Sequence, residues 1–403
     1  MRVMVAVEWG MLALGLFGLL TSSVFLGMVI VGARRFRHEA ERQDAALVAG
    51  PEFLPGVSLF KPLHGDEPSL EAHLRTFFEQ DYLQHAGAGP VEVLFCARNE
   101  ADAGLKVARR VAAEYPEITT RIVTSGEPWA ANAKVCSLVA MAKVATHDLW
   151  VISDSDVRVA PDYLRHVVLP FADKNVGAST CLYRGVAAGG GLWAQLEAVG
   201  MSIEMSSGVC ASLLTEPISF ALGPTMAARR ECVEEVGGFE RMAEYCADDF
   251  VLGNWIAKKH TVALSGHVID HIVLNVDFLN SMKHQVRWMK STRFSRPKGH
   301  LGTALTFGVP FGLLAWGGAL LLGMPLLGWG ALLFGVFGRM LQAWVVGRFV
   351  VQERRLWRTM LLFPVRDLMG IVFWALSYTS NRILWRGEIY ELVEDGKMRP
   401  AVQ

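Results

Sequence analysis

Charged residues and patterned cysteines are both scarce in this chain of 403 residues. Charged residues make up 19% and hydrophobic residues 52% of the sequence, against about 25% charged residues in an ordinary soluble domain. This balance excludes a disordered chain and argues against a wholly soluble enzyme. The six cysteines form no C-x-x-C pair, so we expect no cysteine-based zinc or disulfide framework. Unpatterned thiols fit a reducing compartment.

An excess of either charge is also absent, because Lys+Arg and Asp+Glu are equal at 39 each. Proteins that bind nucleic acid usually carry a surplus of positive charge on the binding domain. We therefore expect no nucleic-acid partner.

Long apolar runs stand at both ends of the chain. The first, residues 9–33, holds 25 positions without a charge, and about 20 are enough for a helix to cross a bilayer. A cleaved signal peptide is the alternative, but the run is longer than a usual signal core, and no clear small-x-small site precedes Arg34. We predict a retained N-terminal transmembrane anchor.

The second run, Leu301–Gly338, has 38 residues without a charge, too many for one straight span. We predict two transmembrane helices within 301–348, joined by a turn between Gly323 and Gly330. A further apolar segment, 359–381, contains Arg366-Asp367. It either spans the membrane with these charges paired inside a helical bundle, or lies in the interface.

Basic residues flank these runs and predict the orientation. They follow the first run, precede the second and follow it again, at Arg34, Arg35, Arg37, Arg293, Arg296, Lys298, Arg348, Arg354, Arg355 and Arg358. The positive-inside rule places all of them in the cytoplasm, together with the long segment 51–296. The tail, 382–403, suits the same side.

The segment 51–296 alternates short apolar runs with helical periodicity. We predict strands near 56–60, 91–97, 120–123 and 149–153, and helices near 68–80, 103–115, 131–145 and 250–259. This alternation is typical of an α/β domain with a mostly parallel sheet covered on both faces. Ligands of such sheets bind beyond the carboxyl ends of the strands, so polar residues just after those ends are the candidate site.

Asp154-Ser155-Asp156 directly follows the strand 149–153. On an extended backbone, carboxylates two residues apart point to the same side. Such hard oxygen ligands suit Mg²⁺ or Mn²⁺ holding a diphosphate. The alternative is a solvated turn.

Two more acidic positions meet the same condition. Asp102 follows the strand 91–97, and Asp248-Asp249 precedes the helix 250–259. The alternative for the pair is a helix N-cap, a position that Asp favours.

A further polar motif, His284-Gln-Val-Arg287-Trp288, stands just before the second apolar run. Arg gives bidentate contacts to phosphate, and Trp stacks on sugars or anchors at an interface. The alternative is a set of juxtamembrane side chains that reach toward lipid headgroups.

This series of D, D-x-D, D-D and R-W, in this order between membrane segments, resembles inverting, lipid-directed glycosyltransferases with a GT-A fold. Within them the chain is similar to the ceramide glucosyltransferase family, across nearly its whole length. Val57-Ser-Leu-Phe-Lys-Pro-Leu-His-Gly looks like that family's "VSLLKPLKG", and Thr76–Tyr82 looks like its "TFFELDY". Trp385-Arg-Gly with Tyr390 looks like its C-terminal motif.

The resemblance implies roles for the matching residues. It implies that Asp102, Lys134 and Asp154 contact the UDP-sugar, and that Asp154 and Asp156 hold the metal. It implies that Asp249 is the catalytic base and that Arg287 and Trp288 form the catalytic R-W pair. His284 stands where the family usually has Gln or Arg, a side chain that contacts the UDP-sugar donor. Asp156 stands where animal ceramide enzymes tend to have glycine.

The segment His284–Trp288, followed by Ser295–Thr303, is more similar to bacterial hopanoid-biosynthesis glycosyltransferases. The resemblance therefore implies a multi-pass membrane enzyme, in a bacterial inner membrane, that transfers N-acetylglucosamine from its UDP form to a hopanoid such as bacteriohopanetetrol. Its alternative is glucose transfer from UDP-glucose to ceramide. Two other classes are a non-catalytic nucleotide-sugar binding protein and a polymerising synthase, and the latter would want Gln at position 284 and more membrane spans.

Overall fold

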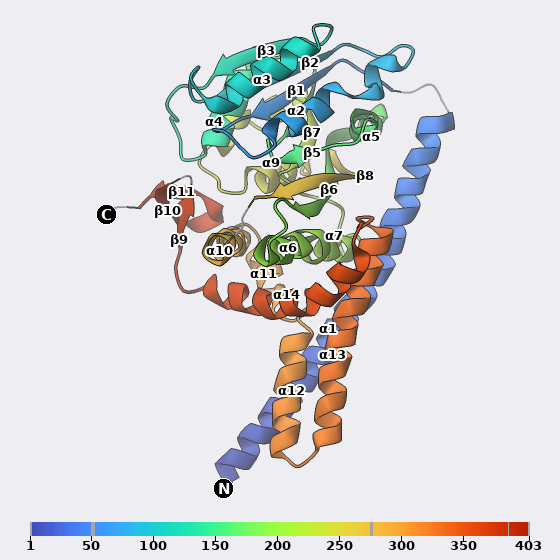
Figure 1. Ribbon diagram of the computed structural model, residues 1–403, viewed down its shortest axis with the longest axis vertical. Helices are drawn as coiled ribbons and strands as arrows, with labels where there is room; N and C mark the ends of the chain where they lie inside the picture. Colours follow the sequence, from blue (N-terminus) through green and yellow to red (C-terminus); the bar gives the residue numbers. More distant parts are fainter. Residues whose placement is uncertain (1, 50–52, 275–276, 386, 402–403) are drawn as a thin grey trace. The chain divides into compact units, whose positions relative to one another are not determined.

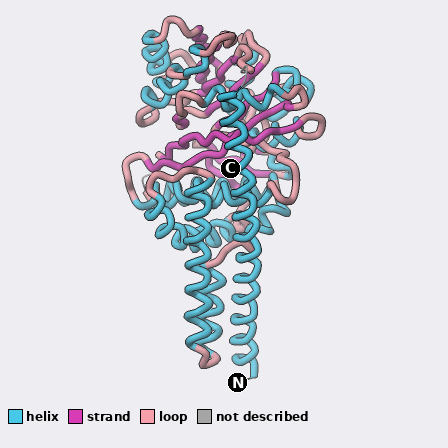
Figure 2. The backbone as a smooth tube through the Cα atoms, turned by 90° about the vertical axis from the view of Figure 1, so that its right-hand side faces the viewer, coloured by secondary structure: helices cyan, strands magenta, loops and turns pink. Residues whose placement is uncertain are grey.

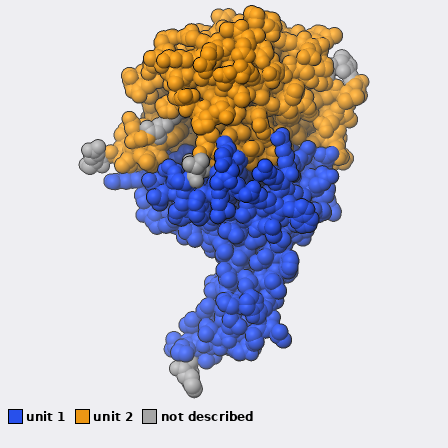
Figure 3. Space-filling view, viewed as in Figure 1, with its two compact units in different colours: residues 1–37, 187–216, 275–383 blue, residues 38–186, 217–274, 384–403 orange. Residues whose placement is uncertain are grey.

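The computed structural model describes residues 2–49, 53–274, 277–385 and 387–401. The chain divides into two compact units, and each is described by itself (Figure 3). Unit 1 comprises residues 1–37, 187–216 and 275–383, and unit 2 comprises 38–186, 217–274 and 384–403.

Unit 2 is built on an eight-stranded sheet with the strand order β3-β2-β1-β4-β7-β6-β8-β5 (Figure 1). Its strands are β1 (Val57–Pro62), β2 (Val91–Ala97), β3 (Thr119–Thr124), β4 (Leu149–Ser153), β5 (Val157–Arg158), β6 (Val176–Ala187), β7 (Thr225–Arg229) and β8 (Thr261–Val273). The helices are α2 (Leu70–Phe78), α3 (Ala103–Glu114), α4 (Ala133–Ala142), α5 (Tyr163–Val168), α8 (Arg230–Glu235) and α9 (Asp248–Ile256). The elements predicted from the sequence are present, with ends shifted by a few residues.

The sheet has two halves of different character. Strands β3, β2, β1 and β4 are parallel neighbours, as the α/β prediction requires. The pairs β4–β7, β6–β7 and β5–β8 are antiparallel, so the prediction of a mostly parallel sheet describes the first half better than the second. Strand β7 is buried as thoroughly as a parallel strand, and its apolar pattern therefore does not reveal its direction.

Unit 1 consists mainly of helices (Figure 2). They are the first part of α1 (Arg2–Ala49), α6 (Leu192–Val199), a π-helical segment (Gly200–Met205), α7 (Ser206–Ser212), α10 (Phe278–Ser295), α11 (Pro297–Thr303), α12 (Val309–Leu321), α13 (Pro325–Phe349) and α14 (Leu356–Leu376). A small C-terminal sheet of β9 (Arg382–Trp385), β10 (Glu388–Leu392) and β11 (Met398–Pro400) follows along the chain, and β10 and β11 belong to unit 2.

The turn between α12 and α13 lies at the predicted break. Gly323 has a φ of +73°, a left-handed value that suits the end of a helix, and Pro325 opens the next helix. Small residues let α1 approach this hairpin closely, since a Cβ on Gly15 would lie 2.4 Å from the backbone nitrogen of Ala315. The buried apolar side chains Leu12, Leu19, Ala319 and Ala331 complete the contact.

Three helices are long and apolar enough to cross a membrane, namely Val3–Ala49, Pro325–Phe349 and Leu356–Leu376, among the residues that the structure describes. Helix α12 is apolar but shorter, at 13 residues. Helix α1 continues well beyond the predicted end at residue 33.

The charges inside the segment 359–381 are buried and paired. Asp367 Oδ2 accepts hydrogen bonds from the backbone nitrogens of Gly308 and Val309 (2.9 and 2.8 Å), and Oδ1 lies 3.7 Å from Arg339. Arg366 lies 2.7 Å from Glu204. Both charges thus have partners on neighbouring helical segments, and Asp367 holds the start of α12. Whether this helix spans the membrane or lies in the interface stays a prediction.

Glu92 on β2 bonds to side chains of the two neighbouring strands, Ser58 on β1 and Arg121 on β3. Its carboxylate is 1% exposed and accepts hydrogen bonds from Ser58, Arg121 and Thr146. Burial alone would raise the pKa of Glu92, but these donors outweigh it and lower the pKa below its ordinary value. The carboxylate therefore stabilises the fold at neutral pH, and this contribution is lost as the pH falls through the lowered pKa.

We expect Glu92→Gln to lower the free energy of unfolding at neutral pH by about 1.5–3 kcal/mol. The difference from wild type should shrink in acid, below the ordinary glutamate pKa of about 4.3. Denaturant unfolding of the chain in detergent measures both effects. The control is Glu117→Gln, a change at an exposed residue, and an equal loss in both variants would contradict this role of Glu92.

Candidate active site

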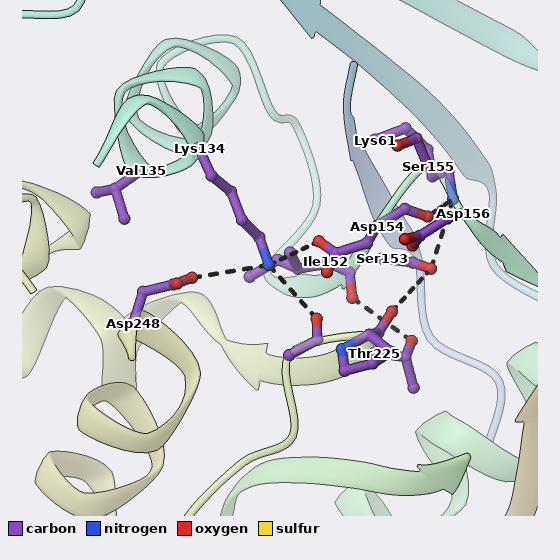
Figure 4. Close-up of polar contacts among 12 residues, drawn as sticks. Lys61, Lys134, Val135, Ile152, Ser153, Asp154, Ser155, Asp156, Thr225 and Asp248 are labelled. Atoms are coloured by element: carbon purple, nitrogen blue, oxygen red, sulfur yellow. Dashed lines mark hydrogen bonds and ion pairs between the residues drawn. The ribbon is translucent and has the colours of Figure 1, made fainter. Parts of the chain in front are cut away.

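The carboxyl ends of the parallel strands bring charged side chains from distant parts of the sequence to one edge of the sheet (Figure 4). Asp154 and Asp156 follow β4, and Lys61 lies near the end of β1. Lys134 reaches this edge from α4, and Asp248 from α9. The structure thus brings together residues that the sequence places almost 190 positions apart.

Lys134 is the centre of this cluster. Its Nζ lies 2.6 Å from Asp154 Oδ1 and 3.7 Å from Asp248 Oδ2, and it donates to the carbonyl oxygen of Gly223 at 3.4 Å. Burial lowers the pKa of Lys134, but the neighbouring carboxylates outweigh this effect and raise it well above its ordinary value. The ammonium group is therefore charged. Asn132 caps α4 by accepting from Val135 N and so fixes the start of the helix.

The two aspartates of the D-x-D motif have different partners. A turn covers Ser155 and Asp156, so the extended backbone that we assumed from the sequence is wrong. Asp154 faces Lys134, whereas Asp156 Oδ2 lies 3.0 Å from Nε2 of His271 on β8. Burial raises the pKa of Asp154. Burial also acts on Asp156, but His271 and Lys61 outweigh it and lower the pKa of that carboxyl, which stays ionised.

Asp102 is bonded to two backbone nitrogens at this edge of the sheet. Its carboxylate accepts from Gly104 N at 2.8 Å, which caps α3, and from Gly65 N at 3.1 Å. It therefore ties the loop after β1 to the start of α3. A contact with a nucleotide, which the resemblance implies, remains a prediction.

Asp248 and Asp249 begin helix α9, and neither is its N-cap. The cap residue is Ala247, so the N-cap alternative is wrong. Asp248 Oδ1 accepts from Asn132 Nδ2 at 3.3 Å. Asp249 lies against Gly223, where a Cβ would approach its Oδ2 to 3.0 Å. Burial, together with the charge of Asp248, raises the pKa of Asp249 to about 6.

Three members of the site were not among the residues chosen from the sequence. Lys61 is fully buried, donates from Nζ to the carbonyl oxygen of Asp154 at 2.5 Å and lies 3.7 Å from the centre of the Phe77 ring. Burial lowers the pKa of Lys61 to about 7. Glu67 accepts from Ser155 Oγ at 2.9 Å. Lys61 and Glu67 could have been chosen from the sequence, because they follow the strand predicted near 56–60. No motif in the sequence around His271 indicates that it belongs to the site.

The motif His284–Trp288 lies on α10 in unit 1 and is described within that unit. His284 Nδ1 lies 2.6 Å from Oε1 of Glu197, a residue that is 1% exposed. Glu197 Oε2 accepts from Ser281 Oγ at 2.6 Å. The rings of His284 and Trp288 are 4.4 Å apart, so Glu197 fixes the ring that packs on Trp288.

The site offers oxygen ligands suited to a divalent cation. Asp156 Oδ1 and Glu67 Oε2 are buried and have no hydrogen-bond partner within the part of the chain that the structure describes. Buried carboxylate oxygens without partners call for a bound cation or water, and hard oxygens suit Mg²⁺ or Mn²⁺. Asp156 of the D-x-D motif, together with Glu67, therefore fits the expected metal ion.

Two solved glycosyltransferase structures resemble this chain at low sequence identity. One is the mannosyltransferase PcManGT from Pyrobaculum calidifontis in complex with GDP-Man and Mn²⁺, at 18% identity and a TM-score of 0.44, covering 89% of this chain and 99% of that one. Another is glucosyl-3-phosphoglycerate synthase from Mycobacterium tuberculosis with Mn²⁺ and UDP-glucose, at 17% identity and a TM-score of 0.37, covering 64% and 83%. Neither TM-score reaches 0.5, and the family of this chain is established by its sequence.

Curated relatives match most of the chain. Ceramide glucosyltransferase 1 of Caenorhabditis elegans is 26% identical over 369 residues, which cover 86% of this chain and 74% of the relative. Ceramide glucosyltransferase 3 of the same organism is 22% identical over 390 residues, covering 90% and 77%. The model of glycosyl transferase family 21 matches residues 17–398. This chain therefore belongs to glycosyl transferase family 21.

Proposed function

We propose that this chain is a membrane-bound inverting glycosyltransferase that moves a hexose from a UDP-sugar to a lipid hydroxyl. Glucose and ceramide are the first candidates for sugar and acceptor. The observation that carries the proposal is the match of family 21 and of ceramide glucosyltransferases across most of the chain. These relatives favour the ceramide alternative over the hopanoid reading that the sequence suggested first.

A hopanoid acceptor with N-acetylglucosamine is the second candidate. It depends on one observation, the similarity of His284–Trp288 and Ser295–Thr303 to hopanoid-directed enzymes. The contact of His284 Nδ1 with Oε1 of the buried Glu197 fixes the orientation of the imidazole ring at this position.

The proposed donor site is the acidic edge of the sheet in unit 2. Lys134, charged and held by Asp154 and Asp248, supplies the positive group for a diphosphate. Asp102 lies at the same edge and orders the loop around Gly65. Asp154 and Asp156 would hold Mg²⁺ or Mn²⁺, which when bound neutralises the diphosphate of the leaving UDP.

The proposed base is Asp249. Its pKa of about 6 leaves it ionised at neutral pH yet basic enough to accept a proton. The acceptor hydroxyl gives its proton to Asp249 while its oxygen forms a bond to the anomeric carbon. The bond from that carbon to the phosphate oxygen breaks, and UDP leaves with the bonding electrons. One displacement inverts the centre, so an α-linked donor gives a β-linked product.

Helix α10 is the proposed source of the remaining contacts. Arg287 would hold phosphate and Trp288 would help to close the site, with His284 set in place by Glu197. The outward-facing apolar side chains of α13, such as Leu326 and Phe337, which are 89% and 61% exposed, fit a lipid environment. A lipid acceptor would approach from that environment.

The substrates can be tested directly. The full chain in lipid vesicles is given labelled UDP-glucose or UDP-N-acetylglucosamine, together with ceramide or a polyhydroxylated hopanoid, and the products are identified by mass spectrometry. We expect a β-linked glucosylceramide. Exclusive transfer of N-acetylglucosamine to the hopanoid would select the second candidate, and UDP binding without transfer to any lipid would favour a non-catalytic protein.

The metal proposal predicts that Asp154→Ala and Asp156→Ala each abolish transfer. A chelator should stop the wild-type reaction, and Mg²⁺ or Mn²⁺ should restore it, because the diphosphate needs its charge neutralised. Asp148→Ala, at the exposed opposite end of β4, is the control and should retain activity. Full activity in chelator would overturn the metal proposal.

The base proposal predicts that Asp249→Asn lowers the turnover number by about 10²–10⁴ and leaves UDP binding near wild type. In the wild type, kcat/KM should fall about tenfold per pH unit below the pKa of about 6, since the base is then protonated. Asp248→Asn should be milder. If Asp249→Asn lost UDP binding in proportion to activity, the residue would belong to the donor site instead.

The orientation proposal places the basic clusters Arg34–Arg37 and Arg354–Arg358, and the segment between 51 and 296, in the cytoplasm, as for a multi-pass protein of a bacterial inner membrane. A reporter fused near Gly126 should report a cytoplasmic position. Detection of the reporter on the other side of the membrane would reverse the orientation and remove ready access to cytosolic UDP-sugars.

A further inference from the structure

A second group of metal-ligating side chains lies in unit 2, away from the D-x-D motif. Asp162 precedes α5, His166 lies within it, and His267 lies on β8. Each can offer one ligand atom, and these atoms all lie within 4.8 Å of one another. Asp162 and His166 are four residues apart, so one turn of helix sets them on the same face.

The distances within this group are close to those of a metal site. His166 Nε2 lies 3.3 Å from Asp162 Oδ2, and His267 Nδ1 lies 3.9 Å from Asp162 Oδ1. A fourth oxygen, Asp44 Oδ1 near the end of α1, lies 3.8 Å from His166 Nε2. Ligand atoms about 2.0–2.1 Å from a tetrahedral Zn²⁺ are about 3.3 Å from each other, so small side-chain movements complete the geometry.

Burial and charge suit a cation at this place. The side chains of His166 and His267 are 8% and 10% exposed, and their rings lie 5.0 Å apart. The carboxylate of Asp162 supplies negative charge beside both rings.

We propose that Asp162, His166 and His267 bind a zinc-class transition metal ion, with Asp44 as the fourth ligand. Imidazole and carboxylate together suit Zn²⁺ better than Mg²⁺ or Ca²⁺, which prefer oxygen ligands alone. His267 is four residues from His271 along β8, or about 13 Å at 3.3 Å per residue.

The place of this metal in the fold indicates a structural role. The end of α1 already packs on β8, where Gln43 accepts from Gly266 N at 2.7 Å and a Cβ on Gly266 would lie 2.6 Å from Ala40 Cα. This packing brings Asp44 beside His166. A metal ion here would join the end of α1, the start of α5 and β8, all within unit 2.

The metal content of the full chain tests the proposal. The protein, purified in detergent with any affinity tag removed, is treated with EDTA, given Zn²⁺ in millimolar Mg²⁺, passed through gel filtration and analysed by mass spectrometry of the metal. We expect about one zinc per chain for this site. Replacing a residue that only supports a ligand typically weakens metal binding about 10–100-fold, so His166→Ala and His267→Ala, which remove ligands, should weaken it at least 100-fold.

A matched control is His260→Ala in the same unit, whose Nε2 lies 2.7 Å from Oε2 of the surface residue Glu235, and it should retain the zinc. Asp162→Asn keeps the size of the side chain and should also lose zinc, which guards against variants that fail to fold. Thermal unfolding gives a second measurement: Zn²⁺ should raise the melting temperature of the EDTA-treated wild type and not that of His166→Ala. With Co²⁺ in place of zinc, the visible spectrum should be that of tetrahedral coordination.

The proposal is overturned if the wild type retains no more zinc than the double variant His166→Ala/His267→Ala. It is also overturned if Zn²⁺ stabilises both proteins equally. In either case the group is a metal-free cluster in which His166 pairs with Asp162 and Asp44. Loss of zinc upon Asp156→Ala alone would assign the ion to the D-x-D motif instead.

Discussion

The acidic edge of the sheet depends on one buried ammonium group, that of Lys134. Without it, the carboxylates of Asp154 and Asp248 would face each other across a buried space, and their mutual repulsion would oppose folding. With it, Asp154 and α9 are held at the strand ends, and Gly223 is fixed by its carbonyl oxygen. The same arrangement leaves Asp249 half-buried beside Asp248, and desolvation together with the charge of Asp248 raises the pKa of Asp249. Folding and the proposed chemistry therefore depend on the same interaction.

Lys61 is a second buried lysine of the site, and its pKa is shifted in the opposite direction to that of Lys134. Burial lowers its pKa to about 7, so this group is close to losing its proton at neutral pH, whereas Lys134 is held firmly charged. Lys61 donates to the backbone of the D-x-D turn, and Lys134 pairs with the first carboxylate of that turn. Together they fix Asp154 from two directions, and Asp156 is left to His271. A preorganised cluster of this kind stabilises charge without rearrangement during a reaction.

Unit 1 also contains buried charges, Arg339 and Asp367, among apolar helices. Arg339 and Asp367 are nearly fully buried, and each has a further partner, Ser22 for the guanidinium and two backbone amides at the start of α12 for the carboxylate. Buried charges are tolerated when such bonds satisfy them. The pair thereby links α1, α12, α13 and α14, which are otherwise held together by close contacts between small residues.

Local patterns in the sequence were enough to predict the helices and strands of the parallel half-sheet, the apolar helices and the turn at Gly323, because periodicity, glycine and proline act over a few residues. The same patterns pointed to Asp154, Asp156, Asp248 and Asp249, since polar residues after strand ends can be read without a structure. Their partners could not be read from the sequence. Lys134 and His271 reach these carboxylates, and Glu67 reaches Ser155, only through the tertiary fold. Strand direction in the second half, the turn within the D-x-D motif and the grouping of Asp162 with His267 were likewise decided by tertiary structure, which alone determines the neighbours of a buried charge.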